Sequence, residues 1–94
     1  MNLIFEWDEE KAKENLRKHK VRFEEAKTVF NDPSSITIYD SHHSSGEHRY
    51  IDIGCSSKGR ILVVVYTERR SNIRIISSRR ATKSEWGVYG KGNS

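Results

Sequence analysis

The spacing of apolar residues is helical in the first third of the chain and strand-like in the remainder. A short apolar run over residues 3–7 predicts a first strand. Ala12, Leu16 and His19 then recur at helical intervals. Because Asp8 is a good N-cap, a helix is predicted to begin behind it and to run to about His19.

A second helix is predicted directly afterwards. Phe23, Ala26 and Phe30 repeat at helical spacing, and the Asn-Asp-Pro run at residues 31–33 ends the pattern. Residues 20–22 are the only link between the two helices, so we expect a tight, angled pair.

The rest of the chain is predicted to be mostly extended. Alternating segments at residues 35–39 and 49–55 predict two strands, and residues 56–59 predict a hairpin turn. An apolar run at residues 61–66 suits a central strand. The alternation is expected to turn four isoleucines toward the core: Ile36, Ile38, Ile51 and Ile53.

Residues 66–82 place five arginines around three isoleucines. Strict alternation along this strand would put Arg74 and Arg80 on one face and Arg79 on the other. An unpaired guanidinium is costly to bury, and Glu68 is the one acid in the stretch. The arginines therefore indicate either a platform for phosphates or a basic, solubilising sheet edge.

These elements predict an α+β fold in a single domain over residues 1–89. A helix pair would cover one face of a four-stranded antiparallel sheet, leaving the other face free to be concave and basic. Thr82 is expected to cap a short last helix that contains Tyr89. Residues 90–94 are expected to form a disordered tail.

Of the 94 residues, 32% are charged, and the net charge is +4. This charge is distributed unevenly along the chain. Residues 1–46 hold seven Lys or Arg against nine Asp or Glu, a net of −2, whereas residues 47–94 hold ten against four, a net of +6. This asymmetry favours a polyanionic partner for the second half, most simply nucleic acid. Basic domains without such a partner can show the same bias.

The single cysteine, Cys55, fits a reducing compartment, and we expect it to be a packed residue, with a catalytic thiol as the alternative. No apolar run reaches membrane-spanning length and the N-terminus lacks a signal-peptide core, so a cytoplasmic protein is expected. The loop that follows residue 39 lacks structural-zinc spacing, and neither a metal nor a cofactor is expected. Its candidate ligands are Asp40, His42, His43 and His48.

Six ordered motifs carry a resemblance to a known family: Phe-Glu-Trp-Asp at 5–8, Asn-Leu-Arg-Lys-His at 15–19, Phe-Glu-Glu-Ala at 23–26, Gly-Glu-His-Arg-Tyr at 46–50, Tyr-Thr-Glu-Arg at 66–69 and Arg-Ile-Ile-Ser-Ser-Arg-Arg-Ala-Thr at 74–82. Over roughly residues 4–89 the chain closely resembles the BrnT family of bacterial type II toxins. The resemblance implies a RelE-like fold and a small ribonuclease that cleaves mRNA, with the ribosome as context, and arrests translation and growth.

The resemblance also implies partners. A BrnA-like ribbon-helix-helix antitoxin would neutralise the toxin in a two-to-two complex, and that complex would bind operator DNA and repress its own operon. The chain departs from the family pattern in two places. Lys20 replaces a glycine, so the turn is expected to manage without a freely available positive φ. Trp86 and Gly87 replace part of a charged run before Tyr89.

RNA supplies its own nucleophile, the 2′-OH, so cleavage requires a base, an acid and cations for the charge that builds on phosphorus, but no metal. Arg79 is the first candidate to clamp the phosphate; the alternative is an ion pair with Glu68 or Glu85. Glu68 is a candidate base or, since an exposed glutamate is a weak base, a group that orients an arginine.

Lys18 and His19 close the first predicted helix, and histidine is the side chain that titrates near neutrality. A half-buried structural histidine is the alternative, because His19 lies on the apolar stripe. Tyr89 could donate a proton, stack on a base or simply pack. Further phosphate contacts are expected at Arg69, Arg74, Arg80 and Lys83.

Two other classes of function remain open on the sequence. One is a basic module that binds nucleic acid or acts as a co-repressor without cleaving RNA. The other is a purely structural partner protein, for which the acidic start of the first helix and the exposed arginines would be interfaces.

Overall fold

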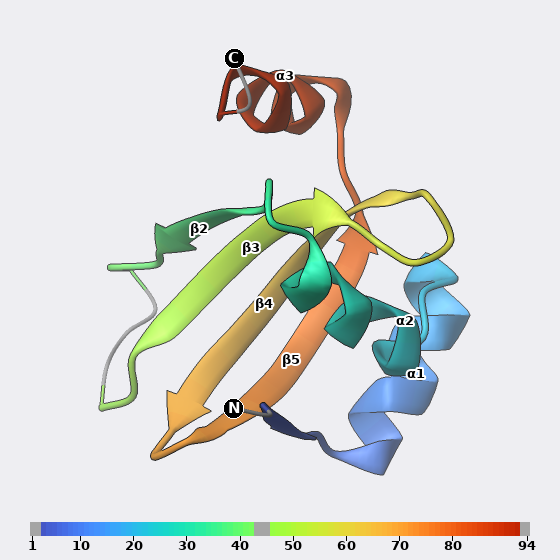
Figure 1. Ribbon diagram of the computed structural model, residues 1–94. Helices are drawn as coiled ribbons and strands as arrows, with labels where there is room; N and C mark the ends of the chain where they lie inside the picture. Colours follow the sequence, from blue (N-terminus) through green and yellow to red (C-terminus); the bar gives the residue numbers. More distant parts are fainter. Residues whose placement is uncertain (1–2, 43–45, 93–94) are drawn as a thin grey trace.

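The computed structural model describes residues 3–42 and 46–92, excluding the side chains of residues 91 and 92. The α and β elements occur in the predicted order (Figure 1): β1 (Ile4–Glu6), α1 (Glu9–His19), α2 (Phe23–Ala26), the 3₁₀ helix η1 (Lys27–Asn31), β2 (Ile36–Tyr39), β3 (Arg49–Cys55), β4 (Ile61–Arg69), β5 (Asn72–Arg80) and α3 (Lys83–Gly92). The predicted second helix is thus a single α turn that continues as 3₁₀. No helix of the described residues is long and apolar enough to cross a membrane.

The five strands form one mixed sheet in the order β1-β5-β4-β3-β2. Strands β2 to β5 are antiparallel neighbours, as predicted, but β1 pairs in parallel with β5, with Ile4 opposite Asn72 and Glu6 opposite Arg74. The prediction of a four-stranded antiparallel sheet was therefore wrong by one strand. Local alternation identifies β1 as a strand. Its pairing with β5 joins residues that are far apart in the sequence, so local alternation cannot predict it.

The core lies between one face of the sheet and the α2–η1 segment, which Figure 1 shows in front of the strands. Phe23 and Val29 are fully buried against Leu62, Val64 and Ile75. We call this side the covered face. It accounts for most of the apolar burial that stabilises so small a domain.

One glycine allows the close approach of η1 to the sheet. A Cβ atom on Gly54 of β3 would lie 2.8 Å from Val29 Cγ1 and 2.8 Å from Ser35 Cβ. Only a residue without a side chain fits at this contact.

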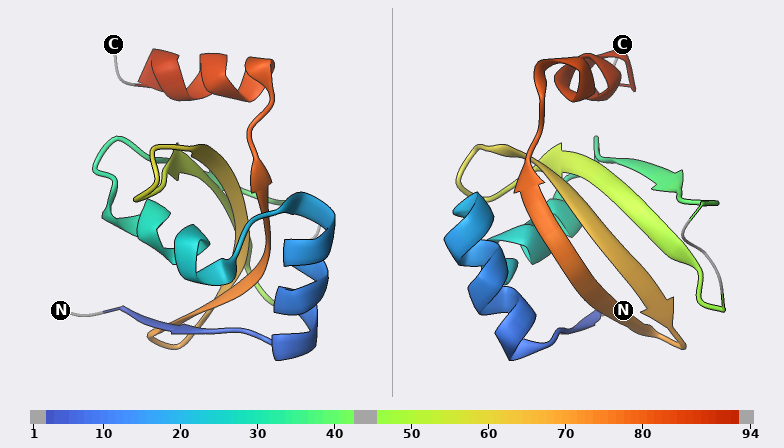
Figure 2. Two further views of the ribbon diagram at one scale, coloured as in Figure 1. Left: turned by 90° about the vertical axis from the view of Figure 1, so that its right-hand side faces the viewer. Right: turned by 180° about the vertical axis from the view of Figure 1, so that it is seen from behind.

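The predicted helix pair required α1 to lie beside α2 on the covered face. It does not. It runs along the outer edge of β5, beyond the point where β1 ends (Figure 2). Asn15, 6% exposed, joins the two. Its Nδ2 donates to Ser78 O at 2.8 Å, and Ser78 N donates to its Oδ1 at 3.0 Å. A side-chain amide thus replaces a neighbouring strand at this edge.

The opposite side of the sheet, the open face, carries the isoleucines that were predicted to face the core. Ile38 pairs with Ile51, and Ile51 with Val65, so these side chains project together. Ile38 is 42% exposed, which contradicts the prediction. Ile53 is buried on this same face near α3, which contacts β3.

A β-bulge in β5 determines which arginines reach the open face. Val65 pairs with Ser77 but Tyr66 pairs with Ile75, so Ile76 is an extra residue. Arg74 and Arg79 therefore both lie on the open face, opposite Thr67 and Val63 respectively. Strict alternation, which had separated them, was wrong because the bulge shifts the phase by one residue.

The helix ends follow local signals. Asp8 Oδ1 accepts a hydrogen bond from Lys11 N at 3.0 Å, which confirms the predicted cap. Thr82 and Glu85 form a reciprocal capping box at the start of α3. Lys20 adopts a left-handed conformation (φ 60°) despite its side chain. Helix α3 continues to Gly92, beyond the predicted domain end at residue 89; residues 93–94 lie outside the described part.

Candidate functional site

A cavity of about 530 Å³ on the open face is lined mainly by basic and polar residues. Arg49 on β3, Thr67 on β4 and Arg74 on β5 form one cross-strand row in it. Lys11 of α1 and Arg69 at the end of β4 complete the lining cations. We call this group the cationic trough: Lys11, Arg49, Arg69 and Arg74.

Acidic residues neutralise part of the trough. Glu47 accepts hydrogen bonds from Arg69 Nε at 3.0 Å and Nη2 at 2.7 Å, and this contact lowers the pKa of Glu47 below its usual range. Arg74 Nη1 lies 4.0 Å from Glu6 Oε2. Two of the four trough cations, Arg69 and Arg74, meet the carboxylates of Glu47 and Glu6, so positive charge outnumbers negative charge there.

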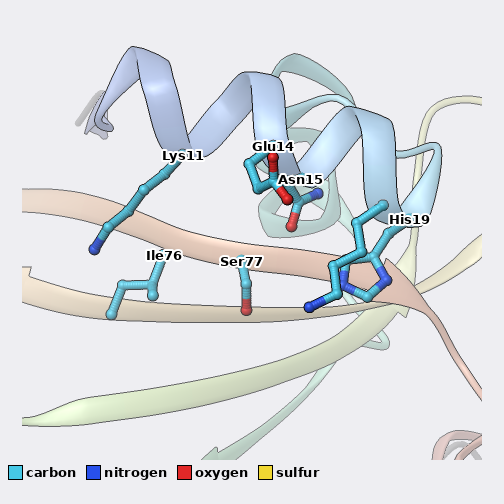
Figure 3. A pocket seen from close by; sticks show the side chains of 7 residues that line it. Lys11, Glu14, Asn15, His19, Ile76 and Ser77 are labelled. Carbon is cyan, nitrogen blue, oxygen red and sulfur yellow. The ribbon is translucent and has the colours of Figure 1, made fainter.

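A second, smaller cavity of about 200 Å³ lies between α1 and β5. Figure 3 shows Lys11 and His19 projecting from opposite ends of α1 toward β5, with Ile76 and Ser77 between them. Lys18 also lines this space, which we call the His19 pocket. Because Lys11 and Ile76 line both cavities, the His19 pocket adjoins the cationic trough.

The structure therefore places four predicted site residues near one another. Arg69 and Arg74 line the trough, and Lys18 and His19 line the adjoining pocket. Their chemical roles stay predictions, but their arrangement places phosphate-binding donors beside an imidazole.

Arg79 has an internal partner. Its Nη1 and Nη2 each donate to one carboxylate oxygen of Glu85, both at 2.8 Å. This bidentate contact lowers the pKa of Glu85 to about 2 and raises that of Arg79. Of the two ion pairs considered for Arg79, the one with Glu85 forms.

The ion pair with Glu68 does not form. Arg79 is opposite Val63, whereas Glu68 lies five residues further along β4, about 17 Å away. Glu68 is exposed and, within residues 3–42 and 46–92, has neither a hydrogen bond nor an ion pair through its side chain. Its role as a base or as a group that orients an arginine stays a prediction.

The remaining predicted residues belong to α3 and its approach. Tyr89 Oη donates to Asp32 Oδ2 at 2.8 Å and helps to hold α3 against the segment before β2. Arg80 and Lys83 lie away from the trough, at a third cavity of about 470 Å³. Trp86 lines the same space, with 57% of its surface exposed.

The described part of the histidine loop shows no grouping suited to a metal. Within the described residues there is no cluster of three His, Cys, Asp or Glu that could hold an ion. His48 Nδ1 lies 3.2 Å from Tyr39 Oη, and His42 is exposed. His43 lies outside the described residues. Cys55 is half-buried at the end of β3.

Sequence reasoning missed three residues of the site: Lys11, Asn15 and Arg49. Lys11, Asn15 and Lys18 are spaced i, i+4, i+7, so a polar stripe runs beside the apolar stripe of α1. This stripe was the available signal for Lys11 and Asn15. Arg49 could be found only from its pairing with Thr67, which requires the sheet register.

Comparisons with known proteins agree with this architecture. The family model described as "Ribonuclease toxin, BrnT, of type II toxin-antitoxin system" matches residues 7–85. The crystal structure of the Brucella abortus ribonuclease toxin BrnT is similar, with a TM-score of 0.68 and 22% sequence identity over 87% of this chain and 100% of that one. A comparison with curated proteins gave no match.

Proposed function

Because the chain belongs to the BrnT family of ribonuclease toxins of type II toxin–antitoxin systems, we propose that it is an endoribonuclease that cleaves mRNA and thereby stops translation and growth. One observation carries the proposal: the cationic trough opens into a pocket that contains His19. Phosphate binding and proton transfer could therefore act on the same nucleotide.

The trough would bind the RNA backbone. Arg49 and Arg74 lie two strands apart in one row, so their Cα atoms are about 10 Å apart. Arginine donates to phosphate in a bidentate fork, whereas Lys11 contributes a compact charge from the opposite wall. We infer that these three residues bind consecutive phosphates, with Arg69 at the rim because Glu47 already engages it.

The reaction would use the substrate's own 2′-OH. His19 takes the 2′-OH proton, the 2′-oxygen attacks phosphorus, and the bond from phosphorus to the 5′-oxygen breaks. The ammonium of Lys18 stabilises the charge on the non-bridging oxygens and supplies the proton that the leaving 5′-oxygen needs. The products are a 2′,3′-cyclic phosphate and a 5′-OH, and no metal takes part in any step.

The other predicted catalytic residues have different positions in this proposal. Arg79 would be a further phosphate contact at the far end of the open face, reached when Glu85 releases it. Tyr89 would position α3 through Asp32. Glu68 lies on the other side of β4 and is not included.

A ribbon-helix-helix antitoxin is the proposed partner. Its acidic segment would cover the trough and neutralise the positive charge there, while its DNA-binding part stays dimeric and represses the operon. Light scattering of the co-purified complex should give a two-to-two assembly. A one-to-one complex, with a single toxin and a single antitoxin, would contradict this part of the proposal.

The test is cleavage by the purified chain, freed of antitoxin, in excess chelator. The parent should produce RNA ends with a 2′,3′-cyclic phosphate. His19→Ala should lower kcat/KM by roughly 10²–10⁴-fold. Arg74→Ala should lower it by at least about tenfold, as expected for the loss of a charge-assisted contact. Arg22→Ala is the matched control, because Arg22 is exposed and lines neither the trough nor the His19 pocket.

A non-catalytic co-repressor is the second candidate. It is favoured by the internal partners of Arg79 and Tyr89, two residues predicted to act on RNA. RNA that binds but is recovered intact, together with harmless overexpression, would support it and contradict the nuclease. Thermal melting of each variant excludes unfolding as the cause of lost activity.

A further inference from the structure

The third cavity joins an exposed aromatic ring to two basic side chains. Trp86 of α3, Arg80 at the end of β5 and Lys83 at the start of α3 all line it, in a space of about 470 Å³. We call it the Trp86 cavity. Arg60 also lines it but is engaged by Glu25, whereas neither Arg80 nor Lys83 has an acidic partner among the described residues.

The orientation of α3 is set by contacts on its other side. Glu85 binds Arg79, and Tyr89, one turn later, donates to Asp32. These two residues hold one face of α3 against the sheet. Lys83 and Trp86, spaced i, i+3, share the neighbouring face and border the cavity. The ring of Trp86 is therefore presented by a helix that is fixed at two points.

The Trp86 cavity lies at the end of β5, where Arg80 pairs opposite the covered-face residue Leu62, whereas Arg74 projects to the open face. Along β5, Arg74 lines the trough, Ile76 and Ser77 line the His19 pocket, and Arg80 lines the Trp86 cavity. This order spans roughly 20 Å of strand. The end of α1 reaches the same region, because Arg60 Nη2, from the cavity lining, donates to Lys20 O at 3.3 Å. The three cavities thus follow one another along β5.

We propose that the Trp86 cavity binds an unpaired base of the RNA substrate, a few nucleotides from the scissile phosphate. The base stacks on Trp86, and Arg80 and Lys83 contact the adjoining phosphates. This inference rests on the proposed function and adds a determinant of substrate choice to it. Single-stranded RNA fits because aromatic rings flanked by cations bind base and phosphate together.

The experiment measures binding of short 2′-O-methyl RNA oligonucleotides, which lack the attacking hydroxyl and stay intact. Trp7, half-buried against Phe23, is replaced by phenylalanine so that Trp86 is the one fluorophore of its kind. Stacking should quench its emission. In the same oligonucleotide, removal of the base that stacks on Trp86 should abolish the quenching, while removal of other bases should not.

Two variants of Trp86 give the affinity test. Trp86→Ala should weaken binding roughly five- to hundredfold, whereas Trp86→Phe, which keeps a stacking ring, should retain most of the affinity. For the oligonucleotide without that base, Trp86→Ala should bind as the parent does. Because Trp86 is exposed, both variants should keep the parent's melting temperature.

The cations are tested by salt dependence. Lys83→Gln should reduce the slope of log affinity against log salt by about 0.7, as expected for one lost phosphate contact on a single strand. Arg22→Gln, the control, should leave the slope unchanged.

The outcomes separate the two proposals. If the parent cleaves RNA but Trp86→Ala binds and cleaves as the parent does, the Trp86 cavity is not an RNA subsite and the nuclease stands. If Trp86→Ala weakens binding of the antitoxin and leaves RNA binding unchanged, the surface belongs to a protein partner and the inference is overturned. If the parent neither binds nor cleaves RNA, both proposals fail.

Discussion

Replacing Glu85 by glutamine tests the contact that fixes α3. Glu85 accepts hydrogen bonds from both Nη groups of Arg79 and from the backbone N–H of Thr82, at 2.8 Å in each case. Glutamine keeps the size of the side chain and one acceptor oxygen, but it removes the charge and one of the two arginine contacts. We expect α3 to be held less firmly and Arg79 to be released.

The magnitude follows from the pKa of Glu85. Its fall from the usual 4.5 to about 2 corresponds to at most ~3 kcal/mol of stabilisation. Because 42% of the Arg79 side chain is exposed, solvent screens the pair, and we expect a loss of ~1 kcal/mol. For a carboxyl group whose pKa is lowered by folding, this stabilisation is complete above about pH 4.5 and is lost as the pH falls toward about 2.

The free energy of unfolding would be measured by urea denaturation near pH 7 and near pH 3. Glu85→Gln should be less stable than the parent near pH 7, and the difference should shrink near pH 3. Native-state hydrogen exchange should show the loss in the amides of α3 first. Glu24→Gln is the matched control, since Glu24 is exposed and has no ion pair among the described residues.

RNA affinity gives a second readout, because a released Arg79 can contact phosphate. At low salt Glu85→Gln should bind RNA a few-fold more tightly than the parent. If its stability near pH 7 equals that of the control variant, or if its pH dependence equals that of the parent, the Arg79–Glu85 pair does not stabilise α3 and the reasoning is refuted.

Two further predictions concern backbone geometry. Lys20→Gly should raise the free energy of unfolding by ~1 kcal/mol, because glycine adopts the left-handed conformation of residue 20 without a Cβ penalty; an unchanged melting temperature would contradict this. Gly54→Ala should lower the free energy of unfolding by ~1–3 kcal/mol, because the alanine Cβ would lie 2.8 Å from Val29 Cγ1. Gly87→Ala is the control for the second variant, since nothing lies within 4 Å of a Cβ at that position.

The extents of most elements could be predicted because their signals are local. Asp8 and Thr82 mark helix starts within three residues of the amides they bind. The Ser-Ser-Lys-Gly turn at residues 56–59 places Gly59 at φ 78°, where glycine is favoured. Such contacts form between near neighbours in the chain, so the order of residues suffices to identify them.

Features that depend on distant contacts could not be predicted in the same way. The bulge at Ile76 is visible only when the pairing of β4 with β5 is known, and it alone brings Arg74 and Arg79 to one face. The attachment of α1 to the β5 edge depends on Asn15 reaching Ser78, 63 residues later. The placement of Lys11 across from Arg49 follows from that attachment.

The order of residues was enough to identify the family, the succession of elements and the excess of cations in the second half of the chain. The tertiary structure decided which cations act together: Lys11, Arg49, Arg69 and Arg74 meet at one cavity, while Arg79 is held by Glu85. The physical reason is that charge and periodicity are properties of single residues and short segments. Which guanidinium meets which carboxylate, and at which cavity, depends on register, a bulge and a helix docked at a sheet edge.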